Sequence, residues 1–497
     1  MTLAEKEMVQ KMASAMGIKL PDTEEKNVTI VREGKQIKLP ENMTYDEGIT
    51  WLQRKKEEEE KQVAIRHQIP CSPLDGLVAF HKALASIYGW TNLAPTPGWF
   101  GGSPPTMIGV PVGHGKTVQV AWGRVNIPNV WGFLQTEFDW GKTPGFLLTG
   151  QTKQKHLPEI LKIREKMEEI VRKDSIYQGN AVKISFQWKR DEDDFDPFQH
   201  APQFMDLANI NENDLILSKS VQKCLNIGLF LPIKHAAFMR KCQAPLKRGV
   251  LMHGKYGVGK SLAAAVTAKL ANKHGWTFLY LNSTEDLEMG LQFARQYSPC
   301  VLFCEDIDKC LDGERDVDMD ALLNLLDGID NKTQECLVVF TTNHIERINP
   351  AAIRMGRLDT VVEITEPDSE AAVRLVKLYG RGLLSPAENY DQIGDVLAGR
   401  IPAFIRETVE RAKIAAIGRL AEEGRLNDST TLENEVLGRD ILDAAKEMEP
   451  HVAMLSRNTN PKKTKVALLA HIPENTPYSS KVLKELGVAA NGEMLDE

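Results

Sequence analysis

The sequence lacks a long apolar run, and it lacks the features of a secretory leader. No stretch approaches the roughly 18 consecutive apolar residues that a membrane-spanning helix needs. The N-terminus, MTLAEKEMVQKM, mixes acidic residues with lysines and contains no apolar segment, which argues against a signal peptide. We therefore expect a cytoplasmic protein that does not associate with membranes.

Cysteine is scarce, with 7 residues scattered over 497. An odd number of dispersed cysteines is typical of reduced thiols rather than of a disulfide framework. Cys300, Cys304 and Cys310 suggest a metal site, but the first two fall in a predicted strand, where residues four apart are separated by about 13 Å. One zinc ion cannot bridge that distance, so we interpret these residues as core or loop thiols.

An excess of positive charge is also missing. The formal net charge is −7 and the isoelectric point is near 6.0, so the chain has no general attraction for nucleic acid, although a local basic face is compatible with this total. The 42% of hydrophobic residues and 26% of charged residues are typical of a globular protein. The length predicts about three domains.

The stretch RGVLMHGKYGVGKSLAAAVTAK, residues 248–269, carries the strongest motif of the chain. A short apolar strand precedes residues 254–261, which match G-x-x-x-x-G-K-[ST], and a run of helix-forming residues follows. Glycines let such a loop wrap a phosphate chain, and the backbone N–H groups and the helix N-terminus favour its negative charge. We expect nucleotide contacts from Gly254, Tyr256, Gly257, Val258, Gly259, Lys260, Ser261 and Leu262. Lys260 is predicted to bind the β- and γ-phosphates and Ser261 to ligate Mg²⁺.

Acidic and polar residues follow two further predicted strands. The apolar strand 300–304 ends in Glu305-Asp306, and the strand 336–343 ends in Asn343. Carboxylates at these positions lie beside the phosphates, where they can hold Mg²⁺ and polarise the attacking water, and Asn343 can orient that water. Arg354 and Arg357 follow on a turn, and arginine is well suited to stabilise charge on a transferring phosphoryl group.

A second GKT sequence, within residues 113–117, is not a phosphate loop. Gly109 is one position too far from it to supply the first glycine of the motif, and residues 118–122 alternate like a strand instead of opening a helix.

With four motifs in this order, the chain resembles the AAA+ ATPases that carry the second region of homology. Their TN and hDPALhRPGRhD patterns are matched by Thr342-Asn343 and by residues 349–359, and the resemblance covers roughly residues 206–455, including an interior helix at 322–329. It implies ATP as the nucleotide and Asn343 as sensor 1. It also implies that Arg354 and Arg357 are arginine fingers acting on a neighbouring subunit, in a homo-oligomeric ring that is usually a hexamer.

The chain departs from the family pattern at three places. In the lid, residues 400–406 stand where many branches have Gly-Ala-Asp or a sensor 2 arginine, and Arg406 is either a sensor 2 candidate or an ordinary arginine of the helix surface. The other two departures lie in the nucleotide-binding domain. The family mostly has Asp-Glu at the strand end, whereas this chain has Glu305-Asp306, so by position Glu305 would serve Mg²⁺ and Asp306 would be the base. The substrate loop is short and offers only Met289-Gly290 where many unfoldases have an aromatic grip. Both features resemble the mitochondrial inner-membrane AAA translocases of cytochrome bc complex assembly, without their membrane segment.

The predicted fold is α/β: an AAA+ P-loop NTPase core with a parallel sheet and a C-terminal α-helical lid, preceded by an α+β N-terminal domain. We expect these divisions: 1–45, helix and hairpin; 46–103, helical region; 104–196, α+β accessory domain; 206–366, nucleotide-binding domain; 367–455, lid; 456–497, flexible tail. Residues 44–69 read as one long helix, residues 181–188 read as a strand of the accessory domain, and Ser385-Pro386 read as the start of a lid helix.

Three functions are compatible with these features. We prefer an ATPase that remodels or translocates a protein substrate held by the N-terminal region. A DNA- or RNA-remodelling motor is the second hypothesis, with Trp122, Trp131, Trp140, Lys116 and Arg124 contacting nucleic acid. A nucleotide-switched ring scaffold that turns over slowly is the third.

Overall fold

The computed structural model describes most of the chain between residues 45 and 458. The described ranges are 29–32, 35–38, 45–89, 92–98, 101–139, 145–185, 201–246, 248–283, 286–307, 335–348, 360–387, 389–426 and 431–458, with residues 11, 43, 353, 357 and 358 as single positions. The predicted helix at 322–329, most of the predicted N-terminal helix and most of the predicted tail lie outside these ranges. Within the described helices, none is long and apolar enough to cross a membrane.

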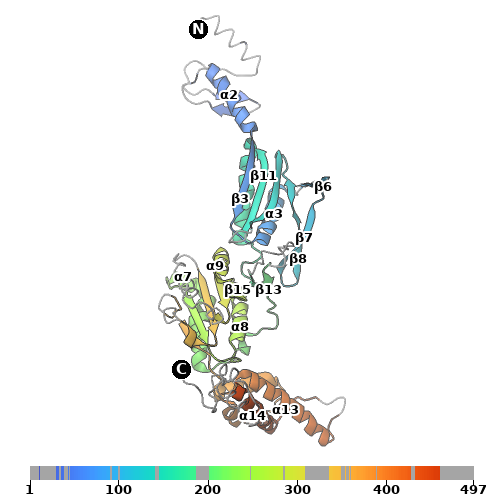
Figure 1. The fold of residues 1–497 in the computed structure, drawn as a ribbon, viewed down its shortest axis with the longest axis vertical. Helices are drawn as coiled ribbons and strands as arrows, with labels where there is room; N and C mark the ends of the chain where they lie inside the picture. The colour runs from blue at the N-terminus through green and yellow to red at the C-terminus, as the bar shows by residue number, and fades with distance from the viewer. Residues whose placement is uncertain are drawn as a thin grey trace, which may run out of the picture.

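The elements follow one another along the long axis of the molecule (Figure 1). The hairpin of β1 (Thr29–Arg32) and β2 (Lys35–Lys38) comes first and is followed by helix α2 (Tyr45–Glu60). The prediction of one helix over 44–69 is wrong beyond Glu60, because residues 62–69 form strand β3 (Gln62–Ile69). Every residue of β3 pairs with strand β11, and this pairing overrides the local helical tendency of the charged run before it.

A five-stranded sheet with the order β3-β11-β10-β9-β4 forms the N-terminal body. Its other strands are β4 (Asn92–Leu93), β9 (Arg124–Asn126), β10 (Gly132–Asp139) and β11 (Gly145–Lys153). Helices α3 (Pro73–Tyr88) and α4 (Leu157–Lys173) pack against each other and against this sheet. The short 3₁₀ turn η1 (Gln154–His156) directly precedes α4. A side chain at Gly76 of α3 would place its Cβ 2.3 Å from the Cβ of Phe146, so glycine permits the close approach of α3 to β11.

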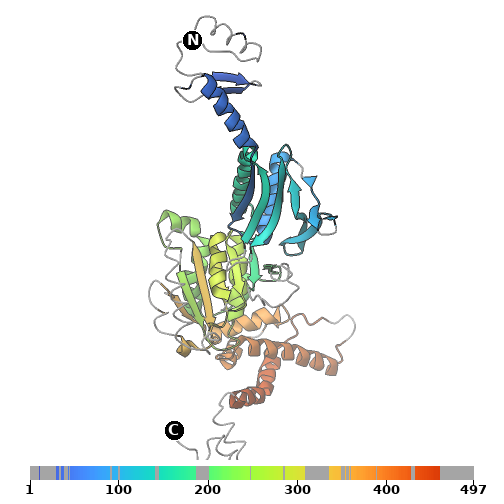
Figure 2. The ribbon, with the colours of Figure 1, turned by 45° about the horizontal axis from the view of Figure 1, so that its top comes forward.

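Two hairpins project beside this sheet (Figure 2). They consist of β5 (Thr96–Gly98) with β6 (Gly101–Ser103), and of β7 (Thr106–Gly113) with β8 (Lys116–Trp122). The GKT sequence that we rejected as a phosphate loop spans the turn between β7 and β8 and the first residues of β8, and no helix follows it.

A second sheet has seven strands in the order β13-β12-β15-β16-β17-β14-β18. The strands are β12 (Ala181–Ile184), β13 (Gln203–Phe204), β14 (Arg248–His253), β15 (Thr277–Leu281), β16 (Cys300–Cys304), β17 (Cys336–Thr342) and β18 (Thr360–Glu363). All neighbours pair in parallel except β12 with β13. Parallel strands are covered on both faces, which explains why β16 and β17 are apolar without alternation and buried at every residue.

Helices cover both faces of this second sheet. Val301 and Phe303 of β16 share a core with α8 (Lys260–Lys273), whereas Leu302 and Cys304 share a core with α9 (Leu287–Gln296). The segment before β14 contains η2 (Glu212–Asp214), α5 (Lys219–Leu225), the π-helical turn η3 (Asn226–Phe230), α6 (Leu231–Lys234) and α7 (Ala236–Lys241). The arrangement is the α/β fold with a parallel sheet that the sequence predicted.

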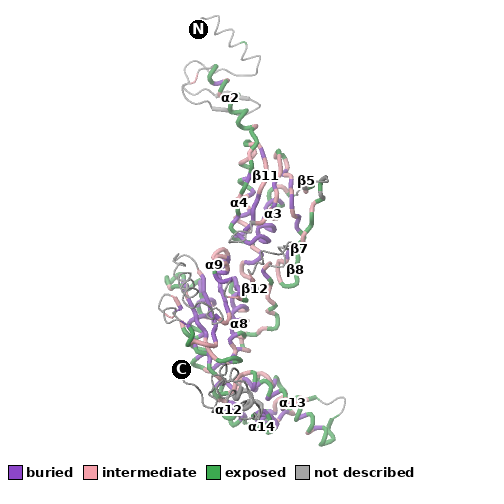
Figure 3. Tube along the Cα trace, in the orientation of Figure 1, coloured by how far each residue is buried: buried purple, intermediate pink, exposed green. Residues whose placement is uncertain are grey.

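The core on the α9 side continues into the N-terminal body. Phe80 and Phe146 of that body belong to the same buried cluster as Phe293 of α9 and Leu302 of β16. The burial-coloured trace shows buried segments in both sheets (Figure 3). The two bodies are therefore joined by packed apolar side chains.

Two of the expected divisions do not follow the sheets. A boundary between residues 103 and 104 cuts through the N-terminal sheet, because β3 and β4 pair with β11 and β9. Strand β12, which we placed in the accessory domain, pairs in parallel with β15 of the second sheet. We propose residues 62–175 as one unit and residues 181–366 as the next.

The last described helices form a bundle with its own core. They are α11 (Ser369–Gly380), α12 (Asp391–Leu397), α13 (Pro402–Glu422) and α14 (Gly438–Asn458). The predicted start of a helix at Ser385-Pro386 is wrong, because the Ser385 amide donates to the Val436 carbonyl at 2.9 Å and α12 begins only at Asp391.

Candidate nucleotide-binding site

The phosphate loop connects the C-terminal end of β14 to the first turn of α8. Gly254, Gly257 and Gly259 have φ values of 157°, 78° and 110°, which residues with a Cβ atom rarely adopt. At Gly254 a Cβ would also lie 2.2 Å from the Ile364 carbonyl oxygen. The Gly254 amide donates to the Thr342 carbonyl at 3.3 Å, so the loop is tied to the end of β17.

The side chains of the loop divide into buried and exposed groups. Val258 is buried in the core beneath the loop, whereas the hydroxyl-bearing Ser261 is exposed and Leu262 is half-buried. Tyr256 is 67% exposed, and its ring lies 6.5 Å from the His344 ring and 5.9 Å from Lys260 Nζ. An exposed hydroxyl at the start of α8 is available to a metal ion that accompanies a phosphate chain.

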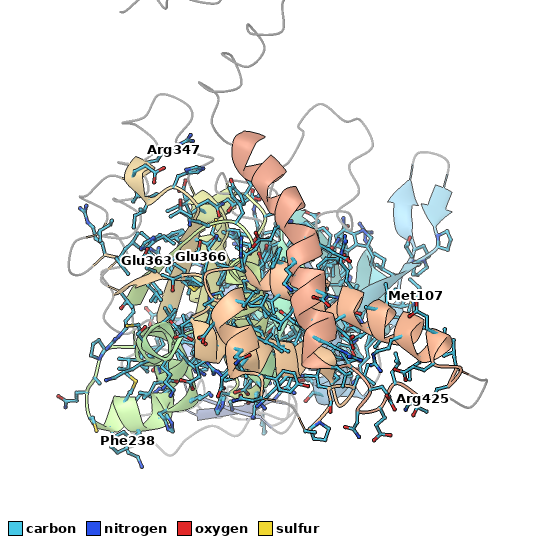
Figure 4. The ribbon with its side chains drawn as sticks, turned by 90° about the horizontal axis from the view of Figure 1, so that it is seen from below. Met107, Phe238, Arg347, Glu363, Glu366 and Arg425 are labelled. Atoms are coloured by element: carbon cyan, nitrogen blue, oxygen red, sulfur yellow. The ribbon has the colours of Figure 1, made fainter. Side chains whose placement is uncertain are left out.

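Lys260 is only 8% exposed, and its ammonium group lies inside the loop. Nζ donates to the carbonyls of Gly254 at 2.7 Å and Lys255 at 2.8 Å. The neighbouring Lys255 is exposed and pairs with Glu366 at 2.6 Å, which holds the pKa of that carboxyl below its usual value. Glu366 comes shortly after β18, close to Glu363 in the view from below (Figure 4).

Asp306 and Asn343 meet at the carboxyl ends of the adjacent strands β16 and β17. Asn343 Nδ2 donates to Asp306 Oδ1 at 3.0 Å, and the Asp306 amide lies 3.1 Å from Thr341 Oγ1. Because β17 also pairs with β14, these groups lie at the same edge of the sheet as the phosphate loop. The structure thus brings together the loop, the carboxylate and the amide that the sequence singled out.

Glu305 is half-buried beside Asp306. Its Oε1 atom is buried and has no hydrogen-bond partner within the described part of the chain. The pKa of Tyr280, on the neighbouring strand β15, is raised mainly by burial and also by a hydrogen bond to Glu305. A buried carboxylate oxygen without a donor fits Mg²⁺, which prefers oxygen ligands, so Glu305 and Ser261 are suited to hold that ion.

The helical bundle touches the phosphate loop through Ile401, directly before α13. A Cβ at Gly257 would lie 3.2 Å from Ile401 Cδ1, so the loop and the bundle are in contact there. Arg400 pairs with Glu449 at 2.7 Å, and Arg406 is exposed on α13. Ile401 could not be predicted from the sequence, because an apolar residue before a helix belongs to no recognisable nucleotide-binding motif.

Arg354 and Arg357 are the two candidate arginine fingers, and the structure describes the second of them. Arg354 lies outside the described residues, whereas Arg357 is half-buried. The backbone of Arg357 lies at the amino end of β14, since a Cβ at Gly249 would be 2.1 Å from the Arg357 carbonyl oxygen. The phosphate loop follows the opposite end of this strand, about 17 Å away at the rise of an extended chain.

The aromatic residues that we considered for nucleic-acid binding do not share one environment. Trp122 packs on Phe138 with the ring centroids 4.2 Å apart, whereas Trp131 is 43% exposed with Lys153 Nζ 5.2 Å from its ring. Arg124 stacks on Phe133 at 3.6 Å, and Trp140 lies outside the described residues.

A glycine loop between a parallel strand and a helix, with acids and an amide at the ends of the next strands, defines a P-loop nucleotide-binding protein. Residues 250–366 match the model of the ATPase family associated with various cellular activities (AAA). These residues therefore form an AAA domain, the type of domain that defines the AAA+ ATPases. The more specific resemblance to the translocases of cytochrome bc complex assembly stays a prediction.

Relatives of this chain come from archaea and eukaryotes. Protein CdcH of Halobacterium salinarum is 27% identical over 241 residues, which cover 44% of this chain and 32% of the relative. Protein SAV of Sulfolobus acidocaldarius is 26% identical over 245 residues, covering 44% and 31%. The 26S proteasome regulatory subunit 8 homolog of Naegleria fowleri is 28% identical over 210 residues, covering 38% and 50%. The chain therefore spans between about a third and a half of these relatives.

Proposed function

We propose that the chain binds ATP with Mg²⁺ and hydrolyses it. The observation that carries this proposal is the 3.0 Å contact between Asn343 and Asp306 at the sheet edge where the phosphate loop begins. This places an amide and a carboxylate where a water molecule could be held against the terminal phosphate.

Each residue has a distinct role in the proposed reaction. Lys260 leaves the loop carbonyls and binds the β- and γ-phosphates, while Asn343 orients the water and Asp306 accepts its proton. Water attacks the γ-phosphorus in line as the bond to the β–γ bridging oxygen breaks, which yields ADP and inorganic phosphate. Ser261 and Glu305 would hold Mg²⁺, which when bound would supply positive charge against the phosphates.

We also propose that the chain forms a homo-oligomeric ring, with a hexamer as the expected size. Arg357 lies at the edge of the sheet opposite the phosphate loop, and about 17 Å is farther than an arginine side chain reaches. Arg357 is therefore suited to approach a nucleotide on a neighbouring subunit, and we assign Arg354 to the same role.

The proposed substrate of the ring is a protein held by the N-terminal body, in the cytoplasm. One relative is named as a homolog of 26S proteasome regulatory subunit 8, and this name supports a protein substrate over a nucleic acid. The packing of Trp122 on Phe138 gives no support to a stacking surface for bases. Turnover that an unfolded protein stimulates would agree with the proposal, whereas stimulation by DNA with a steep salt dependence would contradict it.

Steady-state hydrolysis by Lys260→Ala tests the proposed activity. We expect at least a 100-fold loss relative to the wild type, since the charge that holds the terminal phosphates is removed. Lys273→Ala, on the same helix with a side chain that is 66% exposed, is the matched control and should hydrolyse ATP at the wild-type rate. Equal rates for Lys260→Ala and Lys273→Ala would refute the assignment.

A further inference from the structure

A cavity of about 780 Å³ lies at the junction of the N-terminal body and the nucleotide-binding body. Its walls come from the end of β3, from α4, and from the end of α9. Its size is in the range of pockets that enclose small organic ligands. Neither the phosphate loop nor the strand ends that carry Glu305, Asp306 and Asn343 contribute to it.

Three arginines line this cavity: Arg164 and Arg172 from α4, and Arg295 from α9. Glu168 is the acidic residue among the described residues of the lining. It accepts from Arg164 Nε at 2.9 Å through its carboxylate and from Arg172 Nε at 3.1 Å through its backbone carbonyl. Among the described residues, the lining therefore brings three guanidinium groups together from two helices that belong to different bodies. Burial, and to a lesser extent the charge of Arg164, lower the pKa of the nearby His67, while the charge of Glu168 acts in the opposite direction.

The rest of the lining is suited to an organic group. Ile69, Pro70 and Val171 supply apolar surface, and Gln68 and Gln296 supply side-chain amides that donate and accept hydrogen bonds. Guanidinium groups bind phosphate through two parallel N–H donors, which gives them an advantage over lysine for this group. A lining with both apolar surface and several arginines matches a ligand that carries both an organic part and phosphates.

We propose that this junction cavity binds a small organic phosphate or polyphosphate, which bridges α4 and α9 through Arg172 and Arg295. The ligand would act on the contact between the two bodies. Arg295 and Gln296 come directly before Tyr297, whose hydroxyl accepts from the Ser72 amide at 2.8 Å. Ile69 and Pro70 come shortly before Ser72, so the walls of the cavity continue into both sides of this contact. The site does not depend on the proposed ATPase activity.

Binding of inorganic tripolyphosphate tests the proposal by isothermal titration calorimetry. The full chain carries Lys260→Ala in every sample, which removes the ammonium group of the phosphate loop and so weakens binding of the probe there. Arg172→Gln and Arg295→Gln are added singly, and each should raise the Kd at least tenfold, which corresponds to about 1.4 kcal/mol. Lys173→Gln is the matched control, because it removes the same charge from the next residue of α4, where the side chain is 74% exposed and pairs with Glu169. It should change the Kd less than twofold.

A second readout locates the bound probe. Tripolyphosphate should slow amide hydrogen exchange in residues 68–72 and 293–297, and Arg172→Gln, which lies on the protein surface, should abolish this protection. Absence of saturable binding, or equal weakening by Lys173→Gln and Arg172→Gln, would overturn the proposal. A hexaglutamate peptide that binds more tightly than tripolyphosphate, with the same dependence on Arg172, would overturn the choice of phosphate in favour of an acidic peptide.

Discussion

Asp306 adopts a φ of 51°, in the left-handed region that few residues other than glycine occupy. Aspartate tolerates this region better than most side chains do. The contacts of its backbone with Thr341 and of its carboxylate with Asn343 hold it there, at the end of a buried strand. Unfavourable backbone conformations of this kind persist where surrounding contacts enforce them, and they are common at functional sites.

Asp306→Asn is a clean test of the proposed base, because asparagine also tolerates a positive φ. We expect kcat for ATP hydrolysis to fall by about 10²–10⁴-fold, since the proton acceptor is lost. The Kd for ATP should change less than threefold, measured with a fluorescent analogue. Glu305→Gln should instead raise the Mg²⁺ concentration that is required for half-maximal nucleotide binding. A kcat for Asp306→Asn within threefold of the wild type would remove Asp306 from the mechanism.

Asp75 is a buried carboxylate at the start of α3. Its Oδ1 accepts from the Ile176 amide at 3.0 Å and its Oδ2 from Ser175 Oγ at 2.7 Å. Burial, which outweighs these hydrogen bonds, raises its pKa from 3.8 to about 6. Because the folded protein binds this proton more tightly than the unfolded chain, the contribution of Asp75 to stability is largest below pH 3.8 and is lost as the pH rises to about 6.

Asp75→Asn should remove this pH dependence. The free energy of unfolding of the variant, minus that of the wild type, should increase between pH 4 and pH 7 by up to roughly 3 kcal/mol, the equivalent of the pKa change. Urea denaturation at several pH values measures this difference. A flat difference for Asp75→Asn would contradict the raised pKa.

At the scale of elements, the phosphate loop depends on the absence of a side chain at Gly254. Gly254→Ala would place a Cβ 2.2 Å from the Ile364 carbonyl oxygen at a φ of 157°. We expect ATP affinity to fall at least tenfold, because the loop must move to relieve the overlap. Gly418→Ala is the control within helix α13, where a Cβ meets no atom within 4 Å. It should raise the free energy of unfolding by about 0.5–1 kcal/mol and leave ATP binding unchanged. Wild-type affinity in Gly254→Ala would show that the loop relaxes without cost.

The strands of the nucleotide-binding body could be predicted from the sequence because each is a buried parallel strand. Strand β16, for example, has the bounds that its apolar run indicates, Cys300–Cys304. The carboxyl ends of such strands share one edge of the sheet, so the meeting of Asp306 with Asn343 follows from the strand order. The confirmed part of the prediction is therefore the part in which local pattern and tertiary environment agree.

Strands β3 and β12 show why the rest could not be predicted. The charged run that ends at Glu60 is helical, and the sequence alone favours extending this helix over residues 62–69. These residues form a strand because they pair with β11, which lies far along the chain. The sequence does show β12 as a strand, but not that its partner is β15. Long-range pairing carries no local signal, so the division between the two bodies had to come from the structure.

At the scale of the whole molecule, α9 connects the N-terminal body to the strand that carries the acids. Tyr297 follows α9 and precedes β16, and its buried hydroxyl accepts from the Ser72 amide of the N-terminal body. Its ring makes an edge contact with Tyr177, with the centroids 5.9 Å apart. A shift of β16 during turnover would therefore displace Tyr297 and change its contacts at the junction of the two bodies.

Tyr297→Phe should weaken this junction. The buried amide of Ser72 loses its acceptor, which should lower the free energy of unfolding by about 1–3 kcal/mol in urea denaturation. Tyr88→Phe is the control, because the Tyr88 hydroxyl is buried without a hydrogen-bond partner among the described residues, and its removal should be neutral or stabilising. Equal stability of Tyr297→Phe and the wild type would show that this hydrogen bond does not stabilise the junction.

The central claim is that the active site is completed by a neighbouring subunit, and subunit mixing tests it most directly. Arg357→Ala and Lys260→Ala should each be inactive alone. The first lacks the arginine finger, and the second lacks the lysine that binds the phosphates. When the two are mixed, some rings contain an intact phosphate loop next to an intact finger, so the account predicts that ATP hydrolysis returns to a measurable fraction of the wild-type rate. An Arg357→Ala protein that hydrolyses ATP normally by itself would contradict the account.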